Sequence, residues 1–355
     1  MRTLLCSLLM VANSLCAQTQ VSRYRPGLTP EGTIYYLPAT ALHIAVQIER
    51  ATFTPGELAM YADRYLRLND VGMKPTVSHR VVGMQIVPVG VADTAKCFAV
   101  PFNQRTAASN MVLADDGVLL AVNAEPLPLH THTPFKPAPR PERTDPRRFL
   151  SREILTAGSN AKKAELTADD IYDIRENRNL LSRGQADFMP KDGEQLRLML
   201  QTMERQEQAM VELFAGHTER DTTELTVTFV PRQECRDHVV FRLSKQRGLV
   251  DNDDLSGEPY YIDIEDLHLL PEPAEAPGRK KKEPENGIYV NVPGRMRATI
   301  RHKGQQPQVL EVQAAQFGRV ELLSGDLFDR RFTTHLRLHP ATGAIERLEA
   351  EQPKQ

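Results

Sequence analysis

The chain has 355 residues, of which 41% are hydrophobic and 25% are charged, and its formal net charge is -2. These values are ordinary for a globular protein and exclude an intrinsically disordered chain. The near-neutral charge gives no reason to expect a nucleic acid as partner. The length is sufficient for roughly two domains, and the absence of Trp removes the side chain best suited to stacking against sugars.

Residues 1–17 predict a secretory signal peptide. One basic residue precedes an apolar run from Leu4 to Leu15, and Cys16-Ala17 ends it with small residues. The run is too short for a membrane-spanning helix, which needs ~20 apolar residues. Lipidation of Cys16 is an alternative, although Leu15 stands where such signals normally have a small residue. We expect an exported chain, periplasmic or associated with the cell surface, with no transmembrane segment in the mature protein.

Cleavage after Ala17 would leave Cys97 and Cys235 as the two mature thiols. An exported compartment permits a disulfide between them. Two separate buried thiols are the alternative, because nothing in the sequence places them within bridging distance.

Residues 18–124 predict an N-terminal strand-rich domain with one short helix. Leu42, Ile44, Val46 and Ile48 alternate with mostly polar residues, as in a half-buried strand. The run Thr54-Pro55-Gly56-Glu57 has the residues of a helix start, and the helix is expected to reach about Leu66. Further strands are predicted at 77–89, 97–100 and 118–122.

Residues 125–148 are dense in proline and show no hydrophobic periodicity, so they predict an extended connection and the best domain boundary. Within it, His130 and His132 could place two imidazoles on one face and bind a transition metal. Solvent-exposed polar residues are the alternative interpretation.

Residues 149–355 predict a C-terminal α+β domain that begins with a helical hairpin at 167–215. Thr167 is the expected N-cap of the first helix, and Gly184 ends it. Asp192 is the expected N-cap of the second helix, which runs to Gly216 and carries an apolar stripe.

The rest of this domain predicts strands over 222–349, interrupted by a Pro- and Lys-rich mobile loop at 271–287. A hairpin closes the chain, with Leu336 and Leu338 on its buried face and a turn at 340–343. The predicted fold class is therefore α+β, predominantly β with antiparallel strands, with the helical hairpin inserted between strand-rich halves.

An acidic turn before one of these strands could bind Ca²⁺. Asp251, Asp253, Asp254 and Glu258 supply the oxygen ligands that calcium prefers, but their spacing departs from that of an EF-hand loop. An ordinary acidic turn that leads into a strand is the alternative. No other cofactor is expected.

Familiar catalytic patterns are absent from the sequence. It contains no Gly-x-Ser-x-Gly elbow, no His-Glu-x-x-His helix, no phosphate-binding loop and no Cys-x-x-Cys pair. Because catalytic groups are assembled in space, this lowers the expectation of an enzyme without excluding one.

Several separated stretches together resemble one exported Bacteroidota family, the domain of unknown function numbered 4831. They are the stretch at 35–38, the Tyr-rich helix after 54–57, the connection at 184–193, residues 205–207 and the stretch at 254–259. The resemblance implies export and architecture but no reaction and no catalytic residue.

Together these features favour a non-enzymatic protein of the bacterial envelope that binds another macromolecule or stabilises an assembly. The alternative is an unrecognised hydrolase that acts on an envelope or dietary polymer.

Overall fold

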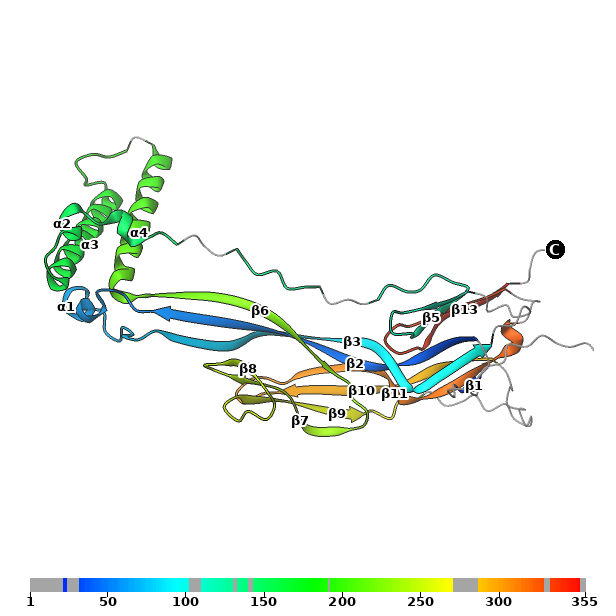
Figure 1. Cartoon of the computed structure of the whole chain (residues 1–355). Coiled ribbons are helices and arrows are strands. Elements are labelled where there is room, and N and C mark those ends of the chain that lie inside the picture. The colour runs from blue at the N-terminus through cyan, green and yellow to red at the C-terminus, as the bar shows by residue number, and fades with distance from the viewer. Residues whose placement is uncertain are drawn as a thin grey trace, which may run out of the picture.

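The computed structural model describes residues 22–23, 32–101, 110–129, 133–139, 143–190, 192–270, 287–328 and 333–351. The molecule is elongated, with helices at one end and most of the strands at the other (Figure 1). Within the described residues the strands form three antiparallel sheets, so the fold is α+β and predominantly β, as predicted. The predicted signal peptide and His130 and His132 lie outside the described residues, as does almost all of the predicted loop at 271–287.

The long sheet, in the order β1-β3-β2-β6, runs along most of the molecule. Its strands are β1 (Ser22–Arg23), β2 (Gly32–Thr54), β3 (Thr76–Pro101) and β6 (His217–Phe229). β2 extends well beyond the predicted alternating segment, and the two strands predicted at 77–89 and 97–100 are one strand. Pairing of β2 with β6 joins chain segments from both sides of the Pro-rich connection.

Two further sheets complete the strand-rich end. The second sheet has the order β11-β10-β9-β7-β8, and the C-terminal sheet has the order β13-β12-β5-β4. The second sheet contains β7 (Cys235–Ser244), β8 (Gly248–Val250), β9 (Glu258–Asp266), β10 (Gly287–Arg301) and β11 (Gln308–Ser324). The C-terminal sheet contains β4 (Met111–Leu113), β5 (Leu119–Val122), β12 (Thr333–Leu338) and β13 (Ile345–Glu351), and η3 (Gly325–Phe328) lies before β12. The predicted closing hairpin is confirmed as β12 and β13, with Leu336 and Leu338 buried.

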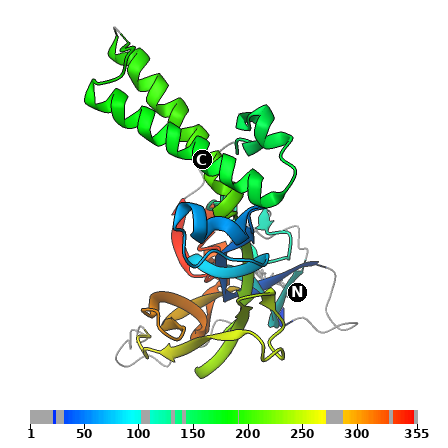
Figure 2. The ribbon, with the colours of Figure 1, turned by 90° about the vertical axis from the view of Figure 1, so that its left-hand side faces the viewer.

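The helical unit caps the other end of the long sheet and leans away from it as an α3–α4 hairpin (Figure 2). Its elements are η1 (Ala59–Tyr61), α1 (Ala62–Leu66), η2 (Pro146–Phe149), α2 (Arg152–Leu155), α3 (Asn160–Arg183) and α4 (Gly193–Ala215). Asp192 caps α4 and Gly184 ends α3 in a left-handed conformation, as predicted. None of the helices in the described part of the chain is both long and apolar enough to cross a membrane.

Two predicted helix starts are wrong. Thr54 does not cap a helix, because β2 pairing continues through that residue and α1 begins only at Ala62. Thr167 lies inside α3, where its hydroxyl donates a hydrogen bond to the carbonyl of Lys163. The helix begins earlier, because the Ser159 side chain accepts a hydrogen bond from the amide of Lys162.

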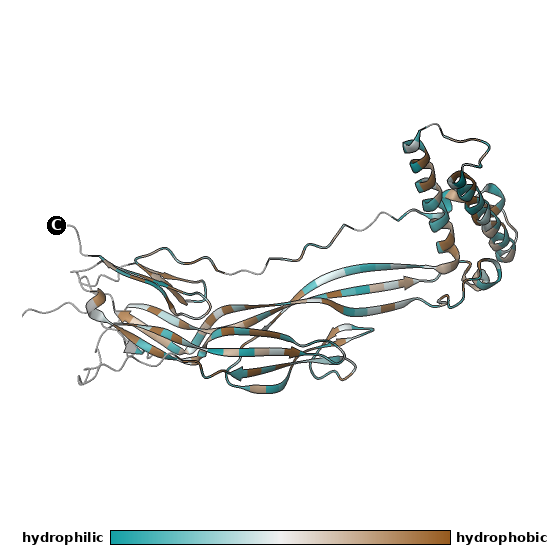
Figure 3. Ribbon diagram, turned by 180° about the vertical axis from the view of Figure 1, so that it is seen from behind, coloured by the Kyte–Doolittle hydropathy of each residue, from teal (hydrophilic) through white to brown (hydrophobic). Residues whose placement is uncertain are grey.

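The described residues form three separate hydrophobic clusters along the molecule. The first lies between the long sheet, with Leu42 and Ile44, and the second sheet, with Ile262 and Ile300. Another surrounds Tyr35 at the strand-rich end, and the last lies within the helical unit. Hydrophobic and hydrophilic residues alternate along the strands, as expected when one face packs on a core (Figure 3).

Between the first cluster and the helical unit, the long sheet continues as a ribbon that we call the neck, comprising residues 49–54, 76–82 and 217–223. All of these residues are described and none of them is buried. Glu49 lies opposite Arg80 on β3 and also binds Arg220 on β6. At its inner end, Val81 packs against the first cluster and the backbone amide of His79 donates to the carbonyl of Lys245. Cross-strand pairing and the ion pairs of Glu49 hold the rest of the neck, which has no core of its own.

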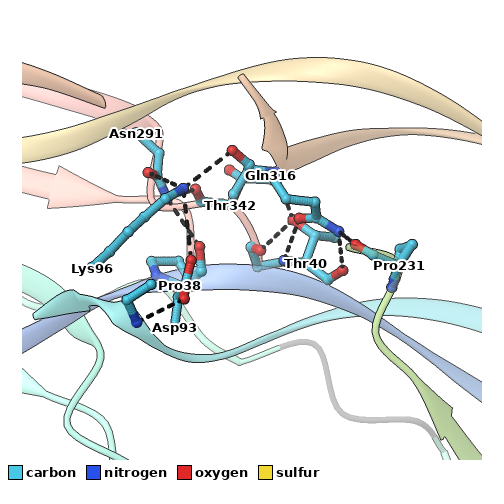
Figure 4. A network of polar contacts seen from close by, with 11 residues as sticks. Pro38, Thr40, Asp93, Lys96, Pro231, Asn291, Gln316 and Thr342 are labelled. Carbon is cyan, nitrogen blue, oxygen red and sulfur yellow. Dashed lines mark hydrogen bonds and ion pairs between the residues drawn. The ribbon is translucent and has the colours of Figure 1, made fainter. Parts of the chain in front are cut away.

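A polar network joins the three sheets at a place that we call the joint, built on Thr40, Asn291 and Gln316 (Figure 4). Thr40 is fully buried; its hydroxyl donates to the carbonyl of Ala341 and accepts from the amide of Ala315. Gln316 accepts from the amide of Thr40 and donates to the carbonyls of Thr40 and Pro231. The side-chain nitrogen Nδ2 of Asn291 donates to the backbone carbonyls of Pro38 and Thr342.

Two irregular stretches of strand shape the joint. On β3, residues 93–96 stand opposite Leu37 alone, and on β11, residues 315–318 stand opposite Pro293 alone. Such bulges turn side chains away from the regular alternation of a strand. Here they place the side chain of Lys96 and that of Gln316 among the buried polar groups of the joint.

Candidate functional site

An open groove of about 650 Å³ lies at the base of the helical unit. The second half of α4 forms one wall, the start of β6 forms another, and residues 143 and 144 at the end of the Pro-rich connection complete it. Arg143, Arg205 and Arg220 line this groove together with Glu212, Glu219 and His217. Two smaller hollows share residues with it, one along the neck and one beside the turn at 54–57.

The local sequence brings the helix and the strand together without a loop. α4 ends at Gly216, whose φ of 74° favours glycine, and β6 begins at the next residue. A Cβ atom at Gly216 would lie 2.4 Å from the carbonyl oxygen of Thr54, and one at Gly56 would lie 2.2 Å from that of Leu213. These close approaches fix the end of α4 against the neck and so fix the groove.

Ion pairs set the electrostatics of the groove and its edges. Arg143 lies 3.0 Å from Glu212, and Arg220 lies 2.7 Å from Glu49. By contrast, Arg205 has no ion pair with any described residue. The groove therefore offers one guanidinium group that is free to bind a carboxylate or phosphate group of a ligand.

The carboxyl groups at the edges of the groove are held in their charged form. Hydrogen bonds from Arg80 and Arg220 lower the pKa of Glu49, against an opposing effect of burial. Hydrogen bonds from Arg147 and Lys163 likewise lower the pKa of Glu57. A general acid or base works best when its pKa lies near the ambient pH. These two carboxyl groups are shifted away from that range and are suited to holding arginine side chains in place.

The groove also contains an imidazole–carboxylate pair. Nε2 of His217 lies 3.6 Å from Oε1 of Glu219, and the imidazole is mostly buried. A nucleophile–base–acid arrangement would need a hydroxyl or thiol group bonded to this imidazole. Among the described residues, no hydroxyl or thiol group donates a hydrogen bond to the imidazole of His217. The described residues therefore supply an imidazole–carboxylate pair without a nucleophile bonded to the imidazole.

Two of the four predicted calcium ligands, Asp254 and Glu258, are engaged by other partners. Asp254 forms an ion pair with Arg247 at 2.7 Å and accepts a hydrogen bond from the amide of Ser256, and the hydrogen bonds to Ser256 are the main reason why its pKa is lowered. Glu258 lies 3.4 Å from His302. Within the described part of the chain, no three His, Cys, Asp or Glu side chains converge as a metal site. Calcium binding at this turn stays a prediction.

Cys97 and Cys235 are not bridged. Cys97 is buried on β3 and Cys235 is half-buried on β7, and both are free. Burial raises the pKa of the Cys235 thiol, which disfavours the reactive thiolate. Of the two alternatives that the sequence leaves open, the structure has separate thiols.

Sequence reasoning did not find the groove. Arg205, Glu212 and His217 stand in a helix and at the start of a strand with no motif around them, and only the tertiary fold brings them beside Arg143. The one local signal is Gly216, since a glycine directly between a helix and a strand indicates a tight approach of two chain segments.

Together, the fold and the groove define a class: an elongated, predominantly β protein with a charged groove under a helical unit. The comparison with known families agrees with the resemblance seen in the sequence. A family model described as "Domain of unknown function (DUF4831)" matches residues 31–346, so the chain belongs to this family. No curated protein and no solved structure matches the chain.

Proposed function

We propose that this chain is an exported protein of the bacterial envelope that binds another macromolecule or stabilises an assembly, and that it does so without catalysis. The observation that supports this proposal most directly is the groove under the helical unit. In the described part of the chain Arg205 has no ion-pair partner, whereas Arg143 and Arg220 beside it are already fixed by carboxylates. Such a surface is suited to an acidic group on a partner.

The elongated shape supports a binding role as well. The neck separates the helical unit from the strand-rich end, so a partner of macromolecular size can reach the groove. Interfaces of this kind use arginine to form paired hydrogen bonds with carboxylate or phosphate groups. An acidic group on the partner therefore supplies the negative charge that no described residue places beside Arg205.

The test is capture from native envelope with a charge-reversed groove. The chain is immobilised as wild type, as Arg205→Glu and as Arg232→Glu, and the bound material is identified by mass spectrometry. Arg232 is exposed and has no ion pair with a described residue, so its reversal makes the same charge change away from the groove. We expect a reproducible partner with wild type and Arg232→Glu, reduced about tenfold or more with Arg205→Glu.

Capture that is equal for all three chains would remove the groove from the proposal. Binding should also weaken as salt rises, since exposed charges are screened over about 10 Å at 0.1 M salt. If the captured polymer were instead shortened on incubation with wild type, the hydrolase alternative would replace the binding role.

A further inference from the structure

The joint places an asparagine and a carboxylate within reach of one lysine (Figure 4). Nζ of Lys96 lies 3.4 Å from Oδ1 of Asn291 and 3.9 Å from Oδ2 of Asp93. Asn291 is 1% exposed, and the Lys96 side chain is 21% exposed. The three groups come from β3 and β10, which belong to different sheets and are not paired with each other.

We propose that Lys96 and Asn291 form an intramolecular isopeptide bond, with Asp93 as the proton carrier. The joint would then be a covalent cross-link between the long sheet and the second sheet. This inference goes beyond the proposed binding function and does not depend on it.

Burial prepares the nucleophile. A lysine amine attacks a carbonyl carbon only in its neutral form, and desolvation disfavours the ammonium. Burial of Lys96 in the joint lowers its pKa, with an opposing influence from the charge of Asp93. Its amine also lies 3.5 Å from the carbonyl oxygen of Ala315, so a second contact holds the end of this flexible side chain near its target.

The electrophile is fixed as well. The side-chain nitrogen Nδ2 of Asn291 donates hydrogen bonds to the backbone carbonyls of Pro38 at 3.0 Å and Thr342 at 2.8 Å. These two bonds set the plane of the carboxamide and leave its oxygen on the side of Lys96. Holding two reactants at this separation in a fixed orientation makes a reaction effectively unimolecular and faster by many orders of magnitude.

The bulge of β3 supplies the proton carrier. Asp93 and Lys96 lie at its two ends, and Oδ1 of Asp93 is held by the amide of Ala95, which leaves Oδ2 facing the lysine. A carboxylate at this place can accept a proton from the ammonium and later return it to a leaving nitrogen.

The step balances without an oxidant or a further reactant. The carboxylate of Asp93 takes a proton from Nζ, the neutral amine attacks Cγ of Asn291, and the new C–N bond forms. The bond from Cγ to Nδ2 then breaks, and the leaving nitrogen departs as ammonium after it receives the proton from Asp93 and one of the two protons still on Nζ, while the other stays on the new amide. A lysine ammonium and a carboxamide become a secondary amide and one ammonium ion.

The test is mass spectrometry of the purified mature chain under denaturing conditions. We expect a tryptic peptide in which the segment around Lys96 is joined to the segment around Asn291, together with an intact mass lower by one ammonia. Intact mass alone does not decide, because an N-terminal glutamine, which Gln18 becomes after the predicted cleavage, also loses ammonia on cyclisation. Recovery of Lys96 and Asn291 only in separate linear peptides would overturn the proposal and reduce the contact to a hydrogen bond.

Two variants sharpen the result. Lys96→Arg keeps a positive charge at the joint but cannot form the amide, so the branched peptide should vanish while far-ultraviolet circular dichroism stays that of wild type. Asp93→Asn keeps both reacting groups and removes the proton carrier, so freshly folded protein should cross-link at least tenfold more slowly. A branched peptide of unchanged yield and rate in Asp93→Asn would remove Asp93 from the mechanism, and one that persisted in Lys96→Arg would show that the link lies elsewhere.

Discussion

The joint and the neck lie on the same long strands but are stabilised in opposite ways. At the joint, β2 is buried and its polar groups bond to partners more than 200 residues away, such as Ala315 and Ala341. At the neck, β2 has only its two neighbouring strands, and charged side chains face solvent. β2 therefore connects the three sheets at the joint, whereas at the neck it separates the helical unit from the strand-rich end.

This difference indicates where the rigidity of the molecule resides. Buried polar groups are costly when unpaired, so a satisfied network selects one arrangement of the three sheets. Exposed ion pairs contribute little and are screened by salt. We expect the sheets to stay fixed relative to one another, whereas the helical unit can change direction at the neck. Substitutions of the same kind in the two regions test this view.

The largest effect is expected for Gln316→Leu at the joint. The change leaves the amide of Thr40 and the carbonyls of Thr40 and Pro231 without their side-chain partner, which should lower the free energy of unfolding by about 3 kcal/mol. Urea denaturation followed by circular dichroism measures it. Gln313→Leu makes the same change at an exposed position of β11 and should cost little. Equal effects at the two positions would contradict the role of the joint.

Threonine substitution compares the two regions on one strand. Thr40→Val keeps the shape of the side chain but leaves the buried amide of Ala315 unbonded, so we expect a loss of about 2 kcal/mol. Thr52→Val, in the neck, should change stability by about 0.5 kcal/mol or less. Urea midpoints of the two variants, with unchanged denaturant slopes, provide the measurement, and a larger loss at Thr52 would reverse our interpretation.

Close packing at the joint predicts a third difference. A Cβ atom at Gly90 would lie 2.1 Å from the carbonyl oxygen of Pro340, so Gly90→Ala should destabilise the protein by about 1–2 kcal/mol. At Gly83 the nearest atom is the end of the Gln47 side chain, which can move, so Gly83→Ala should be close to neutral. Thermal unfolding of both variants distinguishes a backbone clash from a general intolerance of alanine in β3.

The sequence predicts the features of this fold that depend on neighbouring residues better than those that depend on distant segments. Local patterns predict the helix cap at Asp192, the helix end at Gly184 and the alternation of Leu336 and Leu338, because each depends on neighbouring residues. They predict a strand through the β3 part of the neck, at 77–89, but not the continuation of β2 to Thr54. The end of β2 has no buried face in the neck, so its sequence shows no alternation of apolar and polar residues that would indicate a strand.

The groove and the joint are harder to predict for another reason. Thr40, Asn291 and Gln316 are ordinary polar residues in strands, and their partners are set by two bulges that only pairing between distant segments reveals. Arg205 is likewise one of many arginines until β6 is placed beside α4. Nearness in sequence is not a sufficient guide either, because Asp254 and Glu258, two of the predicted calcium ligands, contact different partners.

The smallest loss of stability is expected for Glu49→Gln in the neck. This loss should depend on pH in a characteristic way. Arginine hydrogen bonds lower the pKa of Glu49 in the folded protein. The stability that it contributes is therefore fully present above the pKa of the unfolded state and is lost as the pH falls through the lower folded value. Wild type should exceed the variant slightly at neutral pH and low salt, and the difference should disappear in acid.

Glu346→Gln, which removes an exposed carboxylate from β13, controls for the change in net charge. Its stability should follow that of wild type throughout the titration. Two results would contradict this view: a loss of stability in Glu49→Gln as large as that in Thr40→Val, or a loss that persists in acid or at high salt. Only a desolvated ion pair resists both protonation and screening, so the neck would then depend on more than exposed ion pairs.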